Sequence, residues 1–200
     1  MLTDILPSAA ISGERLTGPW QGLGIEPEAI VHPESVEEVS AALRWAGASG
    51  VRIIAVGSGC HLPALWQEGR FVVLSTTRLT GIEIYEPADL TLTARSGTSL
   101  ADIDAELRTH RQWLPFDPPH VLDHTLGGFV ATGQSGPLWM GYGELRNHVL
   151  GMTIVSGDGR MLKLGGRVMK NVAGFDLLKP IIGSHGRLGV ITSVSLRAFP

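Results

Sequence analysis

The sequence predicts an α+β protein built from two lobes, a small parallel α/β lobe and a larger lobe with a mainly antiparallel sheet. Three features lead to this prediction. Residues 30–80 show strand and helix patterns, strand and hairpin signals follow from residue 81, and glycine-rich turns separate apolar runs in residues 120–192. We therefore expect a first lobe over residues 1–80 and a second over residues 81–200.

The first lobe begins with a clear helix signal. Ser35, followed three residues later by Glu38, is a capping-box pattern, and apolar residues then recur at helical spacing up to Gly50. Apolar runs of strand length occupy residues 51–56 and 71–74. This succession of elements predicts a small parallel α/β unit.

The second lobe carries shorter strands that are close in sequence. Strands are expected at residues 82–85, 90–94, 149–155, 161–164 and 190–196. Asp158 and Gly159 form a strong hairpin signal between two of these strands. Ser99 is the expected N-cap of a helix over residues 100–107. The pattern predicts an antiparallel sheet with covering helices.

Composition excludes several classes of protein. Hydrophobic residues make up 44% and charged residues 18%, which is unlike a disordered chain. The net charge of −3 and the absence of a basic stripe disfavour nucleic-acid binding. The single cysteine, Cys60, cannot form an internal disulfide. Neither a signal-peptide pattern nor an apolar run of about 18 residues is found, so we expect a cytoplasmic protein without direct membrane insertion. Membrane association through partner subunits stays open.

A glycine turn directly follows the apolar run of residues 51–56. Gly57, Ser58, Gly59 and Cys60 lie where a strand-to-turn junction aligns backbone N–H groups that can receive a phosphate. Leu62 stands where a dinucleotide-binding fingerprint needs its third glycine. An ordinary glycine turn therefore remains an alternative on this segment alone.

Two more glycine segments follow in the second lobe. Thr125 is a fair N-cap for a short helix, whose Gly127 and Gly128 would let its amino terminus approach an anion closely. Ser135 and Gly136 lie in a further turn. No lysine lies between residues 71 and 162, so backbone N–H groups and hydroxyl groups would have to meet most of the charge of a bound phosphate.

These segments match a known family. The chain resembles the FAD-binding domain shared by vanillyl-alcohol oxidase and p-cresol methylhydroxylase (PCMH-type), and within that family the small FAD-binding subunit of bacterial glycolate oxidase. The resemblance covers about residues 30–200 and rests on these segments in order: Pro33 to Val36, Gly57 to Gly59, Ala94 to Gly97, Asp117 to Pro119, Thr125 to Gly128, Ser135 to Pro137, Tyr142, Gly143, Arg146, Lys170 to Asp176, and Gly183 to Thr192.

The resemblance implies FAD as cofactor, held in the cleft between the lobes. The turn after the first strand would hold the pyrophosphate, the next two glycine segments would complete the phosphate and ribityl contacts, and the segment before residue 192 would hold the adenosine end through backbone groups. The FAD-binding residues implied in this way are Val56, Gly57, Ser58, Gly59, Cys60, His61, Pro118, Thr125, Gly127, Gly128, Ser135, Gly136, Val190 and Ile191, with Lys170 and Asp176 as weaker candidates.

Two departures from the family pattern change the expectation. Members with a histidyl-linked flavin carry histidine directly after the glycine triplet, where this chain has Cys60, so we expect FAD held non-covalently. We also expect no counterpart of the family's substrate-binding cap domain or of its histidine-rich metal and substrate site. We expect no metal site, and no catalytic residue is assigned.

The resemblance implies a subunit of a glycolate-oxidase-type oxidoreductase that acts on a 2-hydroxy acid. Its partners would be a catalytic flavoprotein subunit and an iron–sulfur subunit. Two alternatives stay open at this point: a non-redox interaction subunit that uses the FAD fold, and a stand-alone flavin oxidase of a small alcohol.

Overall fold

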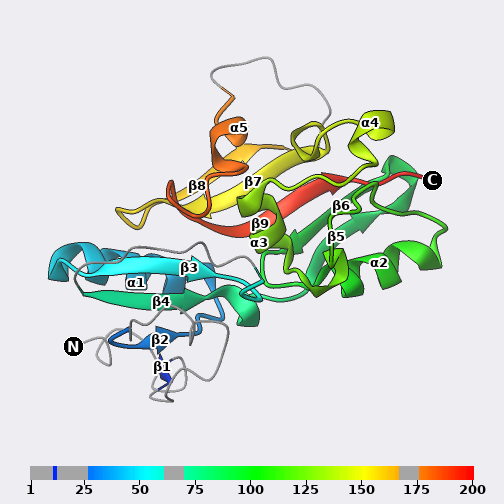
Figure 1. Ribbon diagram of the computed structural model, residues 1–200. Helices are drawn as coiled ribbons and strands as arrows, with labels where there is room; N and C mark the ends of the chain where they lie inside the picture. The colour runs from blue at the N-terminus through cyan, green and yellow to red at the C-terminus, as the bar shows by residue number, and fades with distance from the viewer. Residues whose placement is uncertain (1–10, 13–26, 61–69, 167–175) are drawn as a thin grey trace.

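The computed structural model describes residues 11–12, 27–60, 70–166 and 176–200, and it contains two sheets (Figure 1). The smaller sheet consists of β1 (Ile11–Ser12), β2 (Ile30–Val31), β4 (Phe71–Ser75) and β3 (Arg52–Val56), in that spatial order. Strands β2, β4 and β3 are parallel, and β1 is antiparallel to β2. The predicted parallel unit is therefore confirmed.

Helix α1 (Val36–Ser49) lies beside the smaller sheet and has the predicted ends. The backbone N–H of Glu38 donates to the Ser35 hydroxyl (3.2 Å), and Glu38 Oε2 accepts from the N–H of Glu34 (2.9 Å). Gly50 ends the helix with a φ of 63°, a left-handed conformation that glycine adopts without steric cost.

The larger sheet is antiparallel throughout and has the order β5 (Ile82–Glu86), β6 (Thr91–Arg95), β9 (Val190–Arg197), β7 (Val149–Val155) and β8 (Met161–Gly165). These strands agree with the predicted ranges to within two residues. The hairpin between β7 and β8 turns at Gly159, whose φ is 79°. The α+β fold predicted from the sequence is confirmed.

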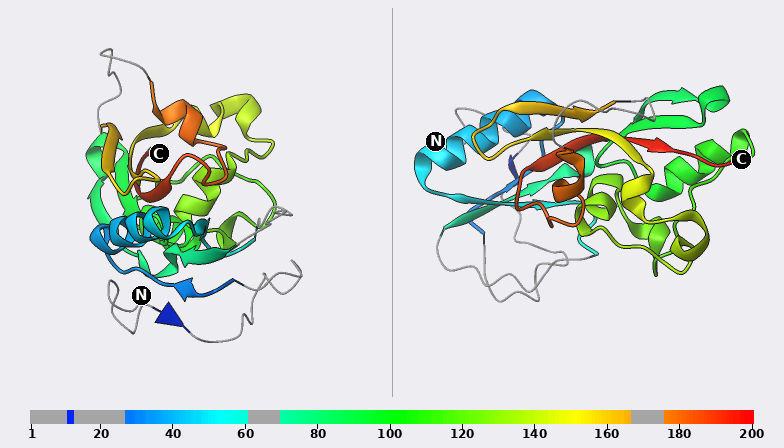
Figure 2. Two further views of the ribbon diagram at one scale, coloured as in Figure 1. Left: turned by 90° about the vertical axis from the view of Figure 1, so that its left-hand side faces the viewer. Right: turned by 90° about the horizontal axis from the view of Figure 1, so that it is seen from above.

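Two helices, α2 (Leu100–Thr109) and α3 (Leu126–Thr132), pack on one face of this sheet. Their apolar side chains form one core with the alternating apolar residues of β6, β7 and β9, since successive strand residues point to opposite faces. Figure 2 shows α3 beside β9 in the view from above. Short 3₁₀ turns span Thr76–Arg78, Pro87–Asp89, Val121–Asp123 and Leu145–Asn147.

The remaining helices are short. Helix α4 (Trp139–Tyr142) begins at Trp139, whose side chain is half exposed. Helix α5 (Leu178–Ile181) follows β8 in the fold. Among the described helices, none combines the length and the apolar character needed to span a bilayer.

The two sheets share part of a core. Val155 of β7 and Val190 of β9 pack in the same cluster as Val39 and Leu43 of α1. Helix α1 therefore contacts both the smaller sheet and the end of the larger one. The boundary at residues 80 and 81 stays a prediction.

Candidate functional site

Strand β3 ends in the turn predicted to receive a phosphate. Its last residue, Val56, is buried, and its carbonyl oxygen accepts a hydrogen bond from the Thr76 hydroxyl (3.2 Å). The backbone N–H groups of Gly57, Ser58, Gly59 and Cys60 donate to no group of the described residues. Successive N–H groups left available in a turn form a concave site for an anion.

This turn contacts the beginning of α3. A Cβ atom at Gly57 would overlap the Thr125 side-chain oxygen and would lie 3.6 Å from Cα of Gly128. Only glycine therefore allows the end of β3 to approach α3 so closely. The contact brings two of the predicted glycine segments together, although they are far apart in the sequence.

The N–H groups at the start of α3 are already used by the protein, contrary to the expectation that they are open to an anion. Leu126 donates to Thr98 O (2.9 Å) and Gly127 to Ser96 O (2.7 Å). Thr125 caps the helix as predicted, because its hydroxyl accepts from Gly128 at 3.4 Å. The amino terminus of α3 is fastened to the segment that follows β6, and its amides contribute mainly to the fold.

Gly127 and Gly128 differ in what surrounds them. A Cβ at Gly127 would lie 2.6 Å from Ser96 Cβ, so this glycine permits close packing within the protein. A Cβ at Gly128 would meet only the Thr125 hydroxyl, at 3.0 Å. Gly128 therefore faces space that the described protein does not fill, which is what a ligand-facing glycine requires.

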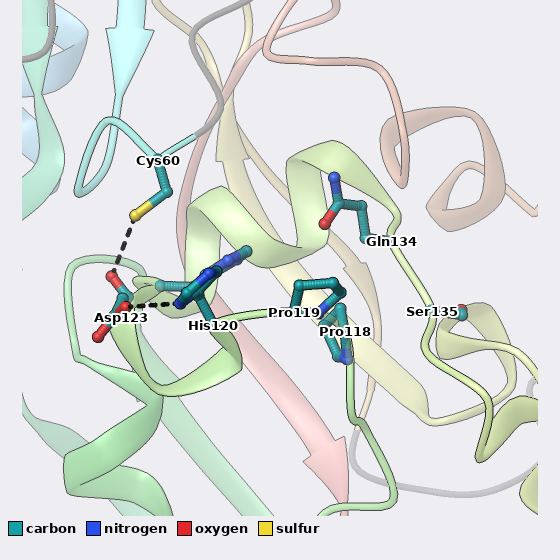
Figure 3. Close-up of a pocket in the computed structure, with 8 residues that line it drawn as sticks. Cys60, Pro118, Pro119, His120, Asp123, Gln134 and Ser135 are labelled. Carbon is teal, nitrogen blue, oxygen red and sulfur yellow. Dashed lines mark hydrogen bonds and ion pairs between the residues drawn. The ribbon is translucent and has the colours of Figure 1, made fainter.

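A cavity of about 480 Å³ lies beside this junction (Figure 3). Its size falls within the usual range of about 300–1,000 Å³ for small-molecule sites. The described residues that line it are Cys60, Pro118, Pro119, His120, Asp123, His124, Gln134 and Ser135.

A hydrogen bond joins the β3 turn to the segment before α3, and an ion pair lies within that segment. In Figure 3, Cys60 points from the end of the β3 turn toward Asp123. The thiol of Cys60 donates to the Asp123 carbonyl oxygen (3.5 Å) and lies 3.2 Å from the Ser58 hydroxyl. His120 Nδ1 lies 3.7 Å from the Asp123 carboxylate. The phosphate turn is thus linked to the segment before α3 through Cys60 as well as Gly57.

The far wall of the cavity comes from the segment after α3. A Cβ at Gly136 would overlap Asp117, so this glycine lets the segment lie directly against the residue before Pro118. Asp117 Oδ1 accepts from the N–H of Leu138 (2.9 Å) and holds the same contact. Pro118 is buried and Ser135 is exposed, and both line the cavity.

Val190 and Ile191 lie at the start of β9, and both side chains are buried. On one side of β9 they pair with Val155 and Ile154 of β7. On the other side, the register with β6 runs from Arg197 only to Ser193. The first two residues of β9 therefore run past the end of β6, and any contact with a ligand there must use their backbone groups.

Comparison with known proteins identifies the family. A model of the FAD-binding domain matches residues 27–165. The chain belongs to the FAD-binding domain family. Among curated relatives, glycolate oxidase subunit GlcE of Escherichia coli (strain K12) is 47% identical over 121 residues, which are 60% of this chain and 35% of that protein. D-lactate dehydrogenase of Archaeoglobus fulgidus is 35% identical over 175 residues, which are 86% of this chain and 38% of that protein.

Solved structures share the fold. An alkyldihydroxyacetonephosphate synthase superposes with a TM-score of 0.84 at 22% identity and covers 99% of this chain and 39% of its own. Phl p 4.0202, a glucose dehydrogenase, superposes with a TM-score of 0.81 at 18% identity, over 100% of this chain and 43% of its own. The chain thus spans less than half the length of each of these four proteins. A further relative of this chain is an FAD-linked oxidoreductase of Mycobacterium tuberculosis.

The described residues fit the cofactor of this family. The N–H groups of residues 57–60, which have no partner in the described part of the chain, suit a pyrophosphate. The space at Gly128 admits a ligand, and the adjoining cavity has the size of a small-molecule site. Of the predicted residues, the structure brings Val56 to Cys60, Pro118, Thr125, Gly127, Gly128, Ser135 and Gly136 together around one junction and its cavity. Their roles toward FAD stay predictions.

Of the remaining predicted residues, those that the structure describes do not line this cavity. Asp176 lies just before α5, is exposed, and pairs with Lys179, whose Nζ is 3.0 Å from Asp176 Oδ2. The hydrogen bond from Lys179 lowers the pKa of the Asp176 carboxyl below its usual value. His61 and Lys170 lie outside the described residues.

Sequence reasoning missed several residues of the site. Asp123 and Gln134 line the cavity, and Ser96 accepts from Gly127, yet none of them was assigned. Gln134 directly precedes Ser135 of the predicted turn, so its place beside that turn was visible. Ser96 gave no such signal, because its contact with Gly127 depends on how distant segments pack.

Proposed function

We propose that this chain is the FAD-binding subunit of an oxidoreductase complex of the glycolate-oxidase type, which acts on a 2-hydroxy acid. The observation that carries the proposal is the junction of the Gly57 turn with Thr125 beside the cavity, in a chain of the FAD-binding domain family. The relative GlcE, a subunit of glycolate oxidase, and a D-lactate dehydrogenase support the substrate class.

In this proposal, the N–H groups of residues 57–60 hold the pyrophosphate of FAD, and Gly128 leaves room for it. Backbone groups of Val190 and Ile191 hold the adenosine end. Bound FAD supplies the two-electron acceptor for oxidation of the 2-hydroxy acid to a 2-oxo acid. Cys60 is not expected to link covalently to the flavin, so FAD dissociates when the protein unfolds.

The cavity wall supports a subunit role better than a stand-alone oxidase. Among its described residues there is a carboxylate, Asp123, but no arginine or lysine. A 2-hydroxy-acid substrate carries a carboxylate, which such a wall would repel rather than clamp. We therefore propose that substrate oxidation requires a catalytic flavoprotein subunit, with an iron–sulfur subunit as the route for electrons.

The test is anaerobic flavin reduction. The FAD-loaded chain is mixed with glycolate or D-lactate, alone and after assembly with candidate partner subunits, and its flavin absorbance is followed. We expect flavin reduction only in the assembled complex. Rapid bleaching of the isolated chain would instead support the stand-alone oxidase, and failure to assemble would contradict the complex.

A further inference from the structure

The loop of residues 183–189 is fixed against both lobes. The N–H of Gly183 donates to Val130 O (3.2 Å), and that of His185 donates to Ala131 O (2.8 Å), so the loop is tied to α3. On another side, a Cβ at Gly189 would lie 2.8 Å from Val155 O of β7. The family resemblance includes this loop, yet only the residues after it were assigned to FAD.

The same loop reaches the strand that leads into the phosphate turn. A Cβ at Gly186 would lie 3.6 Å from Cβ of Ala55 in β3. Ala55 lies one residue before the end of β3, and Gly57 is the first residue after that end. Gly57 contacts Thr125, so the loop and the start of α3 both lie against the carboxyl end of β3 and the residue that follows it.

The proposed pyrophosphate site requires a positive charge, which this loop can supply. A pyrophosphate carries two negative charges, while the described cavity wall contributes the Asp123 carboxylate and no arginine or lysine. Arg187 directly follows Gly186, is exposed, and forms no ion pair with another described residue. By contrast, Arg78 and Arg95 pair with Glu34 and Glu83.

We propose that Arg187 pairs with the pyrophosphate of FAD held by the N–H groups of residues 57–60. The inference rests on the proposed function and names the cation of that site. The planar guanidinium group donates two parallel hydrogen bonds to phosphate oxygens, and such charge-assisted pairs are stronger than neutral ones. The fixed loop reduces the entropy lost when the arginine is ordered.

The experiment measures FAD affinity of the apoprotein by quenching of flavin fluorescence, at low salt and at about 0.5 M NaCl. Arg187→Gln removes the charge. Arg52→Gln is the matched control, because Arg52 is also exposed and lies at the opposite end of β3. For Arg187→Gln we expect about tenfold weaker FAD binding at low salt and a smaller effect of NaCl than in the wild type.

The outcomes separate this inference from the proposed function. Arg187→Gln that binds FAD as tightly as Arg52→Gln, with the same salt dependence, overturns the inference alone. A wild-type chain that binds no FAD overturns the proposed function and the inference with it. Loss of affinity in Arg187→Gln with unchanged thermal unfolding of the apoprotein supports the pairing, because the fold is then intact.

Discussion

Gly57 and Thr125 are in such close contact that a single added carbon at Gly57 would overlap the Thr125 hydroxyl. Gly57 directly follows the last residue of β3, and Thr125 caps α3 on the larger sheet. This contact sets the position of the turn relative to α3 and to the cavity beside it. The glycine is required here by the protein's own packing.

Gly57→Ala should therefore destabilise the apoprotein by about 1–3 kcal/mol, the usual range for forcing extra atoms into a packed site. Gly47→Ala is the control, because nothing lies within 4 Å of a Cβ at that position of α1, and it should be neutral or slightly stabilising. The free energy of unfolding in urea measures both. Equal stability of the two variants would show that the contact with Thr125 does not exclude a side chain at position 57.

A double-mutant cycle tests the same contact directly. Thr125→Ala removes the hydroxyl that the new methyl group would strike, at the expense of a helix cap worth about 1 kcal/mol. Gly57→Ala should cost less stability in the Thr125→Ala background than in the wild type, because contacting residues are not additive. Strictly additive effects would contradict a direct contact.

Gly128→Ala should affect FAD affinity rather than the stability of the apoprotein. The helix gains a residue of higher propensity and the methyl group meets only the Thr125 hydroxyl at 3.0 Å, so the apoprotein should be as stable as wild type or slightly more stable. FAD affinity should fall at least about tenfold if this space belongs to the ligand. Titration with FAD measures the loss, and unchanged affinity would remove Gly128 from the site.

Cys60 offers a chemical probe of the cavity. It is the single cysteine of the chain, is exposed, and lines the cavity. Saturating FAD should slow its alkylation by N-ethylmaleimide at least about tenfold, because a bound ligand restricts access to the thiolate that reacts. Mass spectrometry of the intact chain gives the rate of alkylation. Buffer without FAD and the variant Cys60→Ser are the controls. The same alkylation rate with and without FAD would place the cofactor elsewhere.

The burial of His148 should make the folding stability depend on pH. Its side chain is 3% exposed and lies 5.4 Å from the rings of both Phe116 and Phe199. Burial lowers the pKa of His148 below its usual 6.5, and the charge of Arg197 acts in the same direction. The folded chain keeps the ring neutral, while the unfolded chain takes up a proton as the pH falls through 6.5.

Stability present above pH 6.5 should therefore be lost as the pH falls below that value. His148→Met should reduce the difference in unfolding free energy between about pH 7.5 and about pH 5.5. His110→Met, at an exposed histidine that does not line the cavity, is the matched control. The same pH dependence in both variants would exclude His148 as its source.

Local features of the fold were predictable because they depend on neighbouring residues. The capping box at Ser35, the left-handed glycine at Gly50 and the cap at Thr125 all follow from side-chain and backbone chemistry within one helix. The strands of the larger sheet, and β3 and β4 of the smaller one, were likewise visible as apolar runs with turn residues between them. The two-residue strands β1 and β2 were not predicted.

The role of each glycine was not predictable. A glycine in the sequence indicates that a side chain is excluded, but it does not say what excludes it. The sequence interpretation assigned Gly57, Gly127 and Gly136 to ligand contacts, whereas their missing side chains make room for Thr125, Ser96 and Asp117. These neighbours come from distant segments, and their approach depends on the packing of the whole fold.

The most direct test of the account is the visible absorption spectrum of the purified chain after incubation with FAD and removal of the excess, recorded before and after denaturation. We expect flavin absorbance to stay with the folded chain and to separate from it on unfolding. A folded chain that retains no flavin at saturating FAD would contradict the cofactor site at the Gly57 turn, and flavin that remains attached to the unfolded chain would contradict its non-covalent binding.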